Sequence, residues 1–186
     1  MEAPGAGGRG GLWRVRDTTF RGIGGRKSGT ARMIFTGHAE LTIDAKGRLA
    51  IPAKHRALLR PERDGTAWYC VPWSGHRLML YTEARFVELA ERGEASLTPG
   101  DEEAGVQANF FGLTERLEMD SAGRINVPRL HLELTGIGTD VVIIGSGRRL
   151  EVWDKTAWTA GLAERFEALP RLVQQIEGQK KAGGVI

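Results

Sequence analysis

A nine-residue stretch occurs twice in this chain, and the repeat limits the possible folds more than any other feature of the sequence. Residues 44–52 read Asp-Ala-Lys-Gly-Arg-Leu-Ala-Ile-Pro, and residues 120–128 read Asp-Ser-Ala-Gly-Arg-Ile-Asn-Val-Pro. Four positions are identical, and two more exchange one aliphatic residue for another. The match continues outward at the same offset, with Leu41 corresponding to Leu117, Ile43 to Met119 and Phe35 to Phe111. The sequence therefore predicts two copies of one structural unit.

Both copies predict the same order of elements. Apolar residues alternate with polar ones before each Asp, which is the period of a half-buried strand, and the Asp-x-x-Gly turn leads into a second short strand. The proline that follows can begin a helix, where its missing N–H group costs nothing. Paired β-rich runs around Ser74-Gly75 and around residues 145–147 predict a hairpin in each copy. A helix capped by Thr82 or Asp154 ends the unit.

The offset between the copies falls from seventy-six residues to seventy-two, because Tyr81 corresponds to Trp153 and Phe86 to Trp158. We place this four-residue shortfall in the loop before the hairpin. One such unit cannot bury much apolar surface, whereas two can complete one small barrel. The predicted fold is therefore α+β and mainly β, with short peripheral helices.

The chain divides into five segments by composition and pattern. We expect a disordered basic N-terminal extension over residues 1–32, a first unit over 33–93, a linker over 94–108, a second unit over 109–160 and a C-terminal helical arm over 161–186, interrupted near Pro170.

The positive charge of the chain lies in the first segment. Residues 1–32 hold seven basic and two acidic residues, a net charge of +5, while the whole chain is +3, so residues 33–186 carry −2. The segment is either a basic arm that attracts nucleic acid or a passive extension produced by a start codon upstream of Met33. The high isoelectric point is therefore no argument that the folded part binds DNA.

Several classes of protein are not indicated by the sequence. No run approaches the ~20 apolar residues that span a bilayer, so we expect no membrane role. Cys70 is the only cysteine, which excludes an internal disulfide and fits a reducing cytosol. It lies in an apolar β-rich run, the four histidines have no metal-ligand spacing, and Gly145-Ser146-Gly147 is explained by a hairpin turn. We expect no catalytic site, metal, cofactor or small-molecule substrate.

The repeated turns are the candidate functional site. Asp44 and Arg48, like Asp120 and Arg124, stand four residues apart, so each pair could be a structural ion pair, or the Arg could face a polyanion. The first turn also carries Lys46. The basic residues around it are Lys46, Arg48, Lys54, His55, Arg56, Arg60 and Arg63. Since fewer cations follow the second turn, this pattern places DNA binding mainly on the first unit.

These residues resemble the MraZ family of bacterial transcriptional regulators. The resemblance covers roughly residues 33–160 and is carried by Met33-Ile34-Phe35-Thr36-Gly37, by both Asp-x-x-Gly-Arg signatures ending in Pro52 and Pro128, and by the runs 141–145 and 150–153. It implies a swapped-hairpin barrel of the SpoVT/AbrB type, a ring-shaped homo-oligomer, and sequence-specific binding of double-stranded DNA. The implied operators are repeated promoter boxes ahead of the division and cell-wall gene cluster, including the chain's own promoter, so we expect a cytoplasmic, nucleoid-associated protein.

The resemblance also implies roles for single residues. Lys46, Arg48 and Arg124 match the DNA-contacting positions of the family, and the turn-shaping positions are Asp44, Gly47, Asp120 and Gly123. Two features depart from the family pattern, namely residues 1–32 and Ala122, where a longer polar residue is common. We therefore expect the second turn to contribute less to DNA binding than the first.

Two other functions remain open for this sequence. An antitoxin-like AbrB-fold protein would bind a protein partner, but such chains usually carry one barrel half and a long disordered tail. A non-DNA oligomeric scaffold would not need Lys46 and Arg48 to be free of structural pairing. Loss of DNA binding on mutating Lys46 and Arg48 would separate a regulator from a scaffold.

Overall fold

The structure is a computed structural model, and it describes residues 33–93 and 100–182. The predicted basic extension, residues 1–32, lies outside the described residues, as do residues 94–99 of the predicted linker and residues 183–186. The described residues form an α+β fold that is mainly β, with antiparallel strands and several short helices, as predicted. None of the helices in these ranges is both long enough and apolar enough to cross a membrane.

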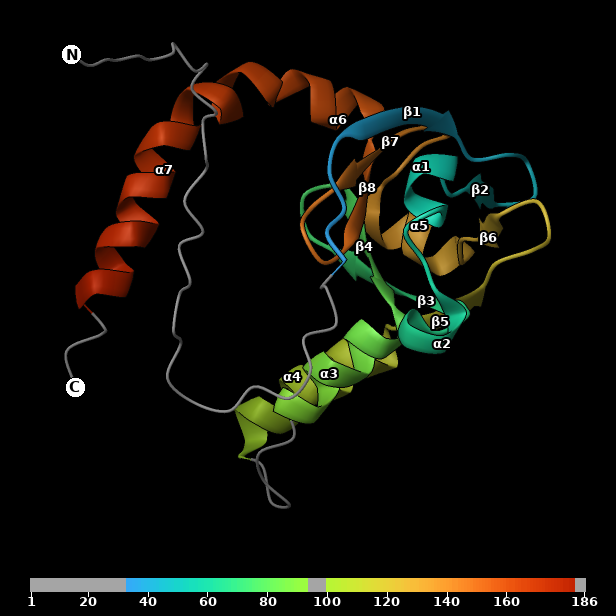
Figure 1. The fold of residues 1–186 in the computed structure, drawn as a ribbon, viewed down its shortest axis with the longest axis horizontal. Coiled ribbons are helices and arrows are strands. Elements are labelled where there is room, and N and C mark those ends of the chain that lie inside the picture. Colours follow the sequence, from blue (N-terminus) through green and yellow to red (C-terminus); the bar gives the residue numbers. More distant parts are fainter. Residues whose placement is uncertain (1–32, 94–99, 183–186) are drawn as a thin grey trace, which may run out of the picture. The chain divides into compact units, whose positions relative to one another are not determined.

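The described elements are labelled in Figure 1. The strands are β1 (His38–Thr42), β2 (Arg48–Ala50), β3 (Ala67–Trp73), β4 (Arg77–Thr82), β5 (Glu115–Glu118), β6 (Arg124–Asn126), β7 (Asp140–Gly145) and β8 (Leu150–Asp154). The helices are α1 (Ala53–Arg56), α2 (Pro61–Asp64), α3 (Glu83–Gly93), α4 (Asp101–Gly112), α5 (Arg129–Thr135), α6 (Lys155–Ala160) and α7 (Leu162–Ala182).

The two copies of the repeat exchange strands. The larger sheet has the order β1-β7-β8-β4-β3-β5 with antiparallel neighbours, while β2 and β6 form a separate two-stranded ribbon (Figure 1). Strand β1 of the first copy thus pairs with the β7–β8 hairpin of the second copy, and β5 of the second pairs with the β3–β4 hairpin of the first. The copies are therefore interlocked, because each hairpin gains its outer strand from the other copy.

The strand pairing has an approximate twofold symmetry. In the ribbon, Leu49 lies opposite Ile125, and these two residues occupy the same position in the two copies. In the larger sheet, Met79 lies opposite Glu151, which are again equivalent positions. The symmetry axis therefore passes between equivalent residues in both sheets.

The hairpin turn is one residue shorter in the second copy. Cys70 lies opposite Leu80 and Ile143 opposite Val152, so the copies are offset by seventy-three residues in the first hairpin strand and by seventy-two in the second. The offset thus falls from seventy-six to seventy-three before the hairpin, and the last residue is lost in the hairpin turn. The prediction that the whole shortfall precedes the hairpin is therefore wrong. A turn can lose a residue without disturbing the packed strands it connects.

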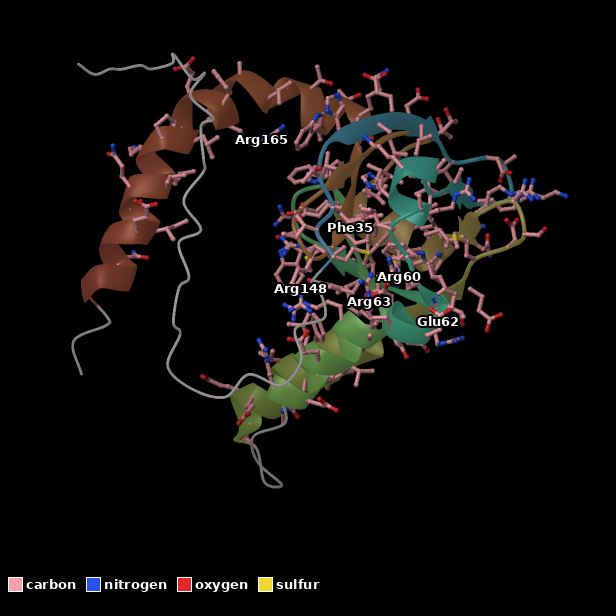
Figure 2. The ribbon with its side chains drawn as sticks, in the orientation of Figure 1. Phe35, Arg60, Glu62, Arg63, Arg148 and Arg165 are labelled. Carbon is pink, nitrogen blue, oxygen red and sulfur yellow. The ribbon has the colours of Figure 1, made fainter. Side chains whose placement is uncertain are left out.

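The main apolar core contains side chains from both copies. Phe35, labelled in Figure 2, is fully buried, and its ring packs against Trp68 and His55 at centroid distances of 5.8 and 5.6 Å. The buried core residues are Phe35, Ile43, Leu49, Ile51, Trp68, Cys70, Leu78, Leu80, Leu117, Ile125, Val127, Ile137, Val141, Ile143, Leu150 and Val152. Because ribbon residues belong to this core, the ribbon is packed against the rest of the fold.

The two sheets do not close into one hydrogen-bonded barrel among the described residues. Strands β1 and β5 are the edges of the larger sheet, and β2 and β6 pair only with each other. The ribbon strands have three residues each, and a turn separates each of them from the sheet strand before it, which interrupts the ladder. The predicted fold class is thus confirmed, whereas a closed swapped-hairpin barrel is not seen.

A second apolar cluster lies around α3 and α4. The Phe86 ring stacks on Tyr69 at 4.2 Å and packs against Phe110 at 6.2 Å. These contacts stabilise α4, Asp101–Gly112, where the sequence predicted a linker followed by the second unit. Phe111 lies on this helix and contacts Phe86 edge-on at 6.1 Å, so its predicted correspondence with the core residue Phe35 is wrong.

The C-terminal residues differ from their prediction in one respect. Asp154 caps α6 as predicted, since its Oδ1 atom accepts a hydrogen bond from the Ala157 N–H at 3.0 Å. Helix α7 runs without a break from Leu162 to Ala182 and contains Pro170, where the sequence predicted an interruption. Proline removes one hydrogen bond from a helix, and the many bonds of a 21-residue helix tolerate that loss.

Two buried histidines predict a loss of stability in mild acid. His55 and His131 occupy equivalent positions in the two copies and are each 1% exposed, and burial lowers the pKa of both below its usual 6.5. Below pH 6.5 the unfolded chain gains protons that the folded chain does not, so stability falls as the pH drops. We expect a decrease of up to about 1.4 kcal/mol per pH unit for each histidine, measured by urea unfolding between pH 7.5 and 5.

The carboxylates with a lowered pKa contribute mainly below this window. The pKa values of Asp44 and Glu88 are lowered to about 2 from their usual 3.8 and 4.5, so the stability that they provide is lost as the pH falls from these unfolded-state values towards 2. Replacing His55 or His131 by Leu should reduce the slope, because each substitution removes one buried imidazole whose pKa is lowered. Slopes equal to that of the parent protein in both variants would contradict this explanation.

Candidate nucleic-acid interface

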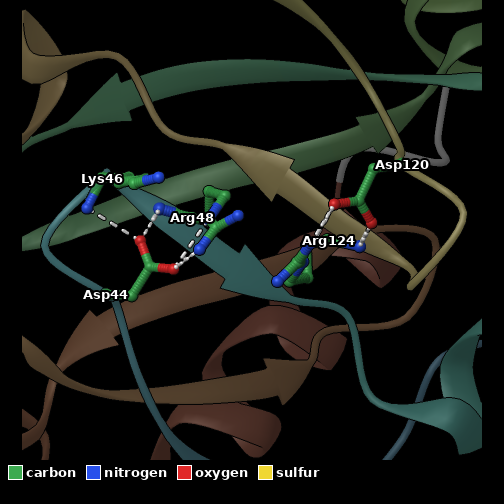
Figure 3. Close-up of polar contacts among 5 residues, drawn as sticks. All are labelled: Asp44, Lys46, Arg48, Asp120 and Arg124. Atoms are coloured by element: carbon green, nitrogen blue, oxygen red, sulfur yellow. Dashed lines mark hydrogen bonds and ion pairs between the residues drawn. The ribbon is translucent and has the colours of Figure 1, made fainter.

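One carboxylate holds the turn between β1 and β2. Oδ1 of Asp44 accepts hydrogen bonds from the backbone N–H groups of Lys46 (2.9 Å) and Arg48 (3.0 Å). Its Oδ2 atom accepts from Nε and Nη2 of the Arg48 side chain, both at 2.7 Å. Gly47, with a φ of 77°, donates its N–H group to the Asp44 carbonyl at 2.8 Å. The turn therefore orients the Arg48 guanidinium (Figure 3).

The turn between β5 and β6 has the same geometry. Oδ1 of Asp120 accepts from the N–H groups of Ala122 and Arg124, both at 2.9 Å, and Oδ2 accepts from Nε (2.9 Å) and Nη2 (2.8 Å) of Arg124. Gly123 has a φ of 78° and donates to the Asp120 carbonyl at 2.9 Å. The Asp–Arg ion pair, one of the two interpretations of the four-residue spacing, is thus present in both turns.

Each turn leads into one strand of the ribbon, whose two faces differ. Leu49 and Ile125 are fully buried on the inner face. Since side chains alternate along a strand, their neighbours lie on the outer face. These outer residues form two cross-strand pairs, Arg48 with Asn126 and Ala50 with Arg124.

Each turn is also bonded to the strand of the other copy. The Gly47 carbonyl accepts from the Val127 N–H at 2.8 Å, and the Gly123 carbonyl accepts from the Ile51 N–H at 2.9 Å. A Cβ atom at Gly123 would lie 2.6 Å from the Arg56 side chain, in addition to the strain of its positive φ. Glycine is therefore favoured in this turn both by the positive φ and by the close Arg56 side chain.

Substituting Gly123 should test how tightly this turn is packed. We expect Gly123→Ala to destabilise the fold by more than the ~1–2 kcal/mol of a left-handed non-glycine residue, because Arg56 must also move. Gly75→Ala is the matched control, since Gly75 has a φ of 81° but no atom near the position of a Cβ. Urea unfolding of both variants measures the difference, and equal losses would mean that Arg56 yields without cost.

Within each turn, the Asp and Arg side chains stabilise each other's charged forms. Hydrogen bonding from the Arg48 side chain lowers the pKa of Asp44 to about 2, and hydrogen bonding from the Arg124 backbone and side chain lowers the pKa of Asp120. Asp44, with a smaller contribution from Asp120, raises the pKa of Arg48. Both ion pairs therefore persist at neutral pH, and the two turns are close enough for their charges to interact.

The cations that flank each turn come from the other copy. Arg56, which follows the first turn in sequence, lies against Gly123 of the second turn and donates from Nε to the Ile51 carbonyl at 2.9 Å. Arg129 of the second copy lines a hollow of about 550 Å³ beside the first turn. Both turns thus have a nearby Arg, so the scarcity of cations, one of two reasons for expecting a weaker second turn, does not hold in the structure. The other reason remains, since Ala122 stands where the first turn has a lysine.

The predicted contact residues lie around one ribbon. Lys46, Arg48 and Arg124 come together there, as Figure 3 shows, and both Arg side chains are about one-third exposed. The Lys46 ammonium is exposed, and no partner lies within hydrogen-bonding distance of it among the described residues. The ribbon and its first turn therefore present two oriented cations and one exposed Lys on one surface.

The described residues contain no constellation typical of an enzyme. Cys70 is fully buried, and burial raises the pKa of its thiol, which disfavours the reactive thiolate. Within the ranges 33–93 and 100–182, no group of three or more His, Cys, Asp or Glu side chains could hold a metal ion.

Two residues of this surface were not predicted from the sequence. Asn126 lies on the outer face of the ribbon opposite Arg48. The alternation along its own strand could have shown that it faces outward with Arg124, but not that it lies opposite Arg48. Arg56 lies beside the second turn, and no local pattern reveals that, because the contact depends on strand exchange between the copies.

The chain is similar in sequence to known proteins. A family model described as "MraZ protein, putative antitoxin-like" matches residues 34–107 and 110–175. A relative from Coxiella burnetii is 30% identical over 139 residues, which are 74% of this chain and 91% of the relative. One from Chromobacterium violaceum is 38% identical over 124 residues (67% and 83%), and one from Methylobacillus flagellatus is 32% identical over 147 residues (78% and 98%). All three are named "Transcriptional regulator MraZ", which is not a class of enzyme.

Proposed function

The chain belongs to the MraZ family, and from this premise we propose that it regulates transcription by binding double-stranded DNA through the outer face of the β2–β6 ribbon. The operators would be repeated promoter boxes of the division and cell-wall gene cluster, including its own promoter. The observation that carries this proposal is the pair of identical Asp-held turns, which aim Arg48 and Arg124 from one narrow ribbon.

The dimensions and chemistry of the ribbon suit the major groove. That groove admits a two-stranded β-ribbon, and Arg reads guanine through two hydrogen bonds to O6 and N7. Asp44 engages only the Nε and Nη2 groups of Arg48, so the N–H groups at the Nη1 end remain to donate. The ion pair and DNA contact are therefore compatible, since the carboxylate holds the guanidinium while its far edge meets the base.

Lys46 has a different role in this proposal. Its flexible ammonium, exposed beside Arg48, suits a phosphate contact that positions the ribbon without reading sequence. Few phosphates are neutralised by one ribbon, so a single subunit would bind weakly and its affinity would fall with salt.

We infer that self-association compensates for this weakness. The strand exchange is consistent with a swapped-hairpin AbrB-like barrel, and helix α7 provides a surface for assembly into a ring. Its apolar residues recur at alternating intervals of four and three, which is the seam of a helix that packs on another helix. The exposed seam residues are Leu162, Phe166, Leu169, Val173 and Ile176.

Charged substitutions in this seam should dissociate the oligomer into monomers. We expect the double variant Phe166→Glu, Ile176→Glu to be monomeric in light scattering, because two charges in an apolar interface carry a large desolvation cost. Glu167→Gln, on the same helix but outside the seam, is the control and should keep the parent mass. A parent protein that is itself monomeric would contradict the self-association proposal.

A gel-shift titration tests the DNA-binding function directly. The probe is a duplex from upstream of the chain's own gene, compared with a duplex of the same composition in scrambled order. We expect retardation of the first at protein concentrations that leave the second free. Equal affinity for the two probes would refute sequence-specific regulation and favour the scaffold function.

A further inference from the structure

We propose that Asn126 reads an adenine beside the base bound by Arg48, and that it makes the two ends of the ribbon recognise different sequences. This inference rests on the proposed DNA-binding function and concerns the specificity of the same surface.

The outer face of the ribbon is symmetric at one pair of positions and asymmetric at the other. Arg48 and Arg124 are equivalent in the repeat, have the same carboxylate partner and sit on both sides of the symmetry axis. Ala50 and Asn126 are also equivalent, and both are exposed, but only Asn126 has hydrogen-bonding groups in its side chain. A ribbon with two like Arg anchors therefore carries one additional polar group at one end.

The Asn126 amide is available to a ligand. Its Oδ1 atom lies over the backbone of Gly47, about 3.2 Å from where a Cβ of that residue would stand. Within residues 33–93 and 100–182, no group makes a hydrogen bond to this amide. Among the described residues, the N–H groups and the oxygen of this amide are therefore not used in structural hydrogen bonds.

The position of Asn126 suits base recognition. It lies directly opposite Arg48, and cross-strand neighbours stand about 4.5–5.5 Å apart, so the two side chains can reach neighbouring base pairs. Asn recognises adenine by donating to N7 and accepting from N6, as Arg recognises guanine through O6 and N7. At the other end Ala50 can offer only a methyl contact, which leaves Arg124 as the polar reader there.

The surroundings of the two turns are also different from each other. The first turn borders the hollow of about 550 Å³ that Lys46, Asn126 and Arg129 line. At the second turn the Arg56 side chain lies against Gly123. The ends of the ribbon therefore differ in shape as well as in hydrogen-bonding groups.

Selection from a pool of duplexes tests this inference, because the operator sequence need not be chosen in advance. The full-length protein and its Asn126→Ala and Ala50→Asn variants are each incubated with duplexes that contain ten randomised base pairs, and the bound fraction is sequenced. For the parent we expect one adenine position next to a preferred guanine, with discrimination against other bases of roughly 5- to 150-fold. Asn126→Ala should lose this preference to within twofold and keep the guanine preferences.

The converse variant makes the test two-sided. Ala50→Asn should add a second adenine preference beside the guanine read by Arg124, which brings the preferred site closer to a palindrome. Thermal unfolding should show that both variants fold, since both positions are exposed.

The outcomes separate this inference from the proposed function. If the parent enriches no sequence, the DNA-binding function itself fails, and this inference with it. If the parent enriches a sequence that Asn126→Ala enriches equally, the function stands and the role of Asn126 is refuted.

Discussion

Replacing Arg48 by Ala should reduce affinity for a selected operator by roughly 100-fold or more, to the level of non-specific binding. Arg48 is oriented by two contacts with Asp44, so under the proposed function its replacement should remove a bidentate base contact from every subunit on the DNA. It also leaves the Asp44 carboxylate facing the DNA without its partner. Fluorescence anisotropy with operator and scrambled duplexes measures both the specific and the non-specific affinity.

The fold should survive this substitution, because the turn keeps hydrogen bonds that do not involve the Arg48 side chain. Asp44 still accepts from the Lys46 and Arg48 backbones, and Leu49 remains in the core. Arg92→Ala is the matched control, since Arg92 is an exposed Arg paired with an acid, Glu88, four residues away on α3. If the Arg48→Ala protein binds the operator as tightly as the Arg92→Ala protein, Arg48 does not belong to the DNA interface.

Two related variants refine the result. Arg48→Lys keeps the charge but not the planar fork, so it should retain non-specific affinity and lose sequence preference. Arg124→Ala should cost about as much as Arg48→Ala, because both turns have the same geometry and Arg56 lies beside the second. The sequence alone predicted a milder effect, on the assumption that cations act on the turn they follow.

The two expectations for Arg124 differ because some features of the fold can be predicted from the sequence and others cannot. The strand on either side of each Asp turn and the cap at Asp154 follow from short-range patterns, and the Asp–Arg pair was one of two interpretations of the four-residue spacing; the structure contains each of them. Hydrogen bonds from Asp to the second and fourth residues after it require only local chain geometry. These features could therefore be derived without a structure.

The strand exchange could not be derived in this way. Pairing of β1 with β7, a contact between residues about one hundred positions apart, satisfies the same apolar pattern as pairing within one copy. Everything that depends on it, including the contact of Arg56 with Gly123 and the place of Asn126 beside Arg48, was hidden for the same reason. The resemblance to a swapped-hairpin family implied the exchange, but no residue pattern demanded it.

The predictions for α4 and α7 were wrong for a different reason. Phe110 and Phe111 lie at the end of a polar, acidic stretch, so the sequence assigned them to the second unit, whereas their contacts with Phe86 place them on α4. Pro170 was expected to interrupt a helix, but α7 continues through it. In both cases tertiary contacts or helix length outweighed a local preference.

Affinity from several weak ribbons, and not from one strong contact, is the second large effect that we expect. One box should bind near the non-specific range of about 10⁻⁴–10⁻⁶ M at physiological salt, because each ribbon has few base-reading side chains. Two boxes in their native spacing should bind roughly 10²-fold more tightly or better, since the second ribbon then acts at a high effective concentration. Titration of the protein against one-box and two-box duplexes gives the ratio.

Geometry provides the decisive control for this mechanism. Shifting one box by about five base pairs, half a helical turn, should remove most of the gain, because the second ribbon would then face the wrong side of the duplex. The Phe166→Glu, Ile176→Glu variant should bind one-box, two-box and phase-shifted duplexes with about equal affinity, since a monomer presents one ribbon at a time. If the parent protein also binds all three alike, its subunits do not read repeats together, and the affinity must come from contacts within a single subunit.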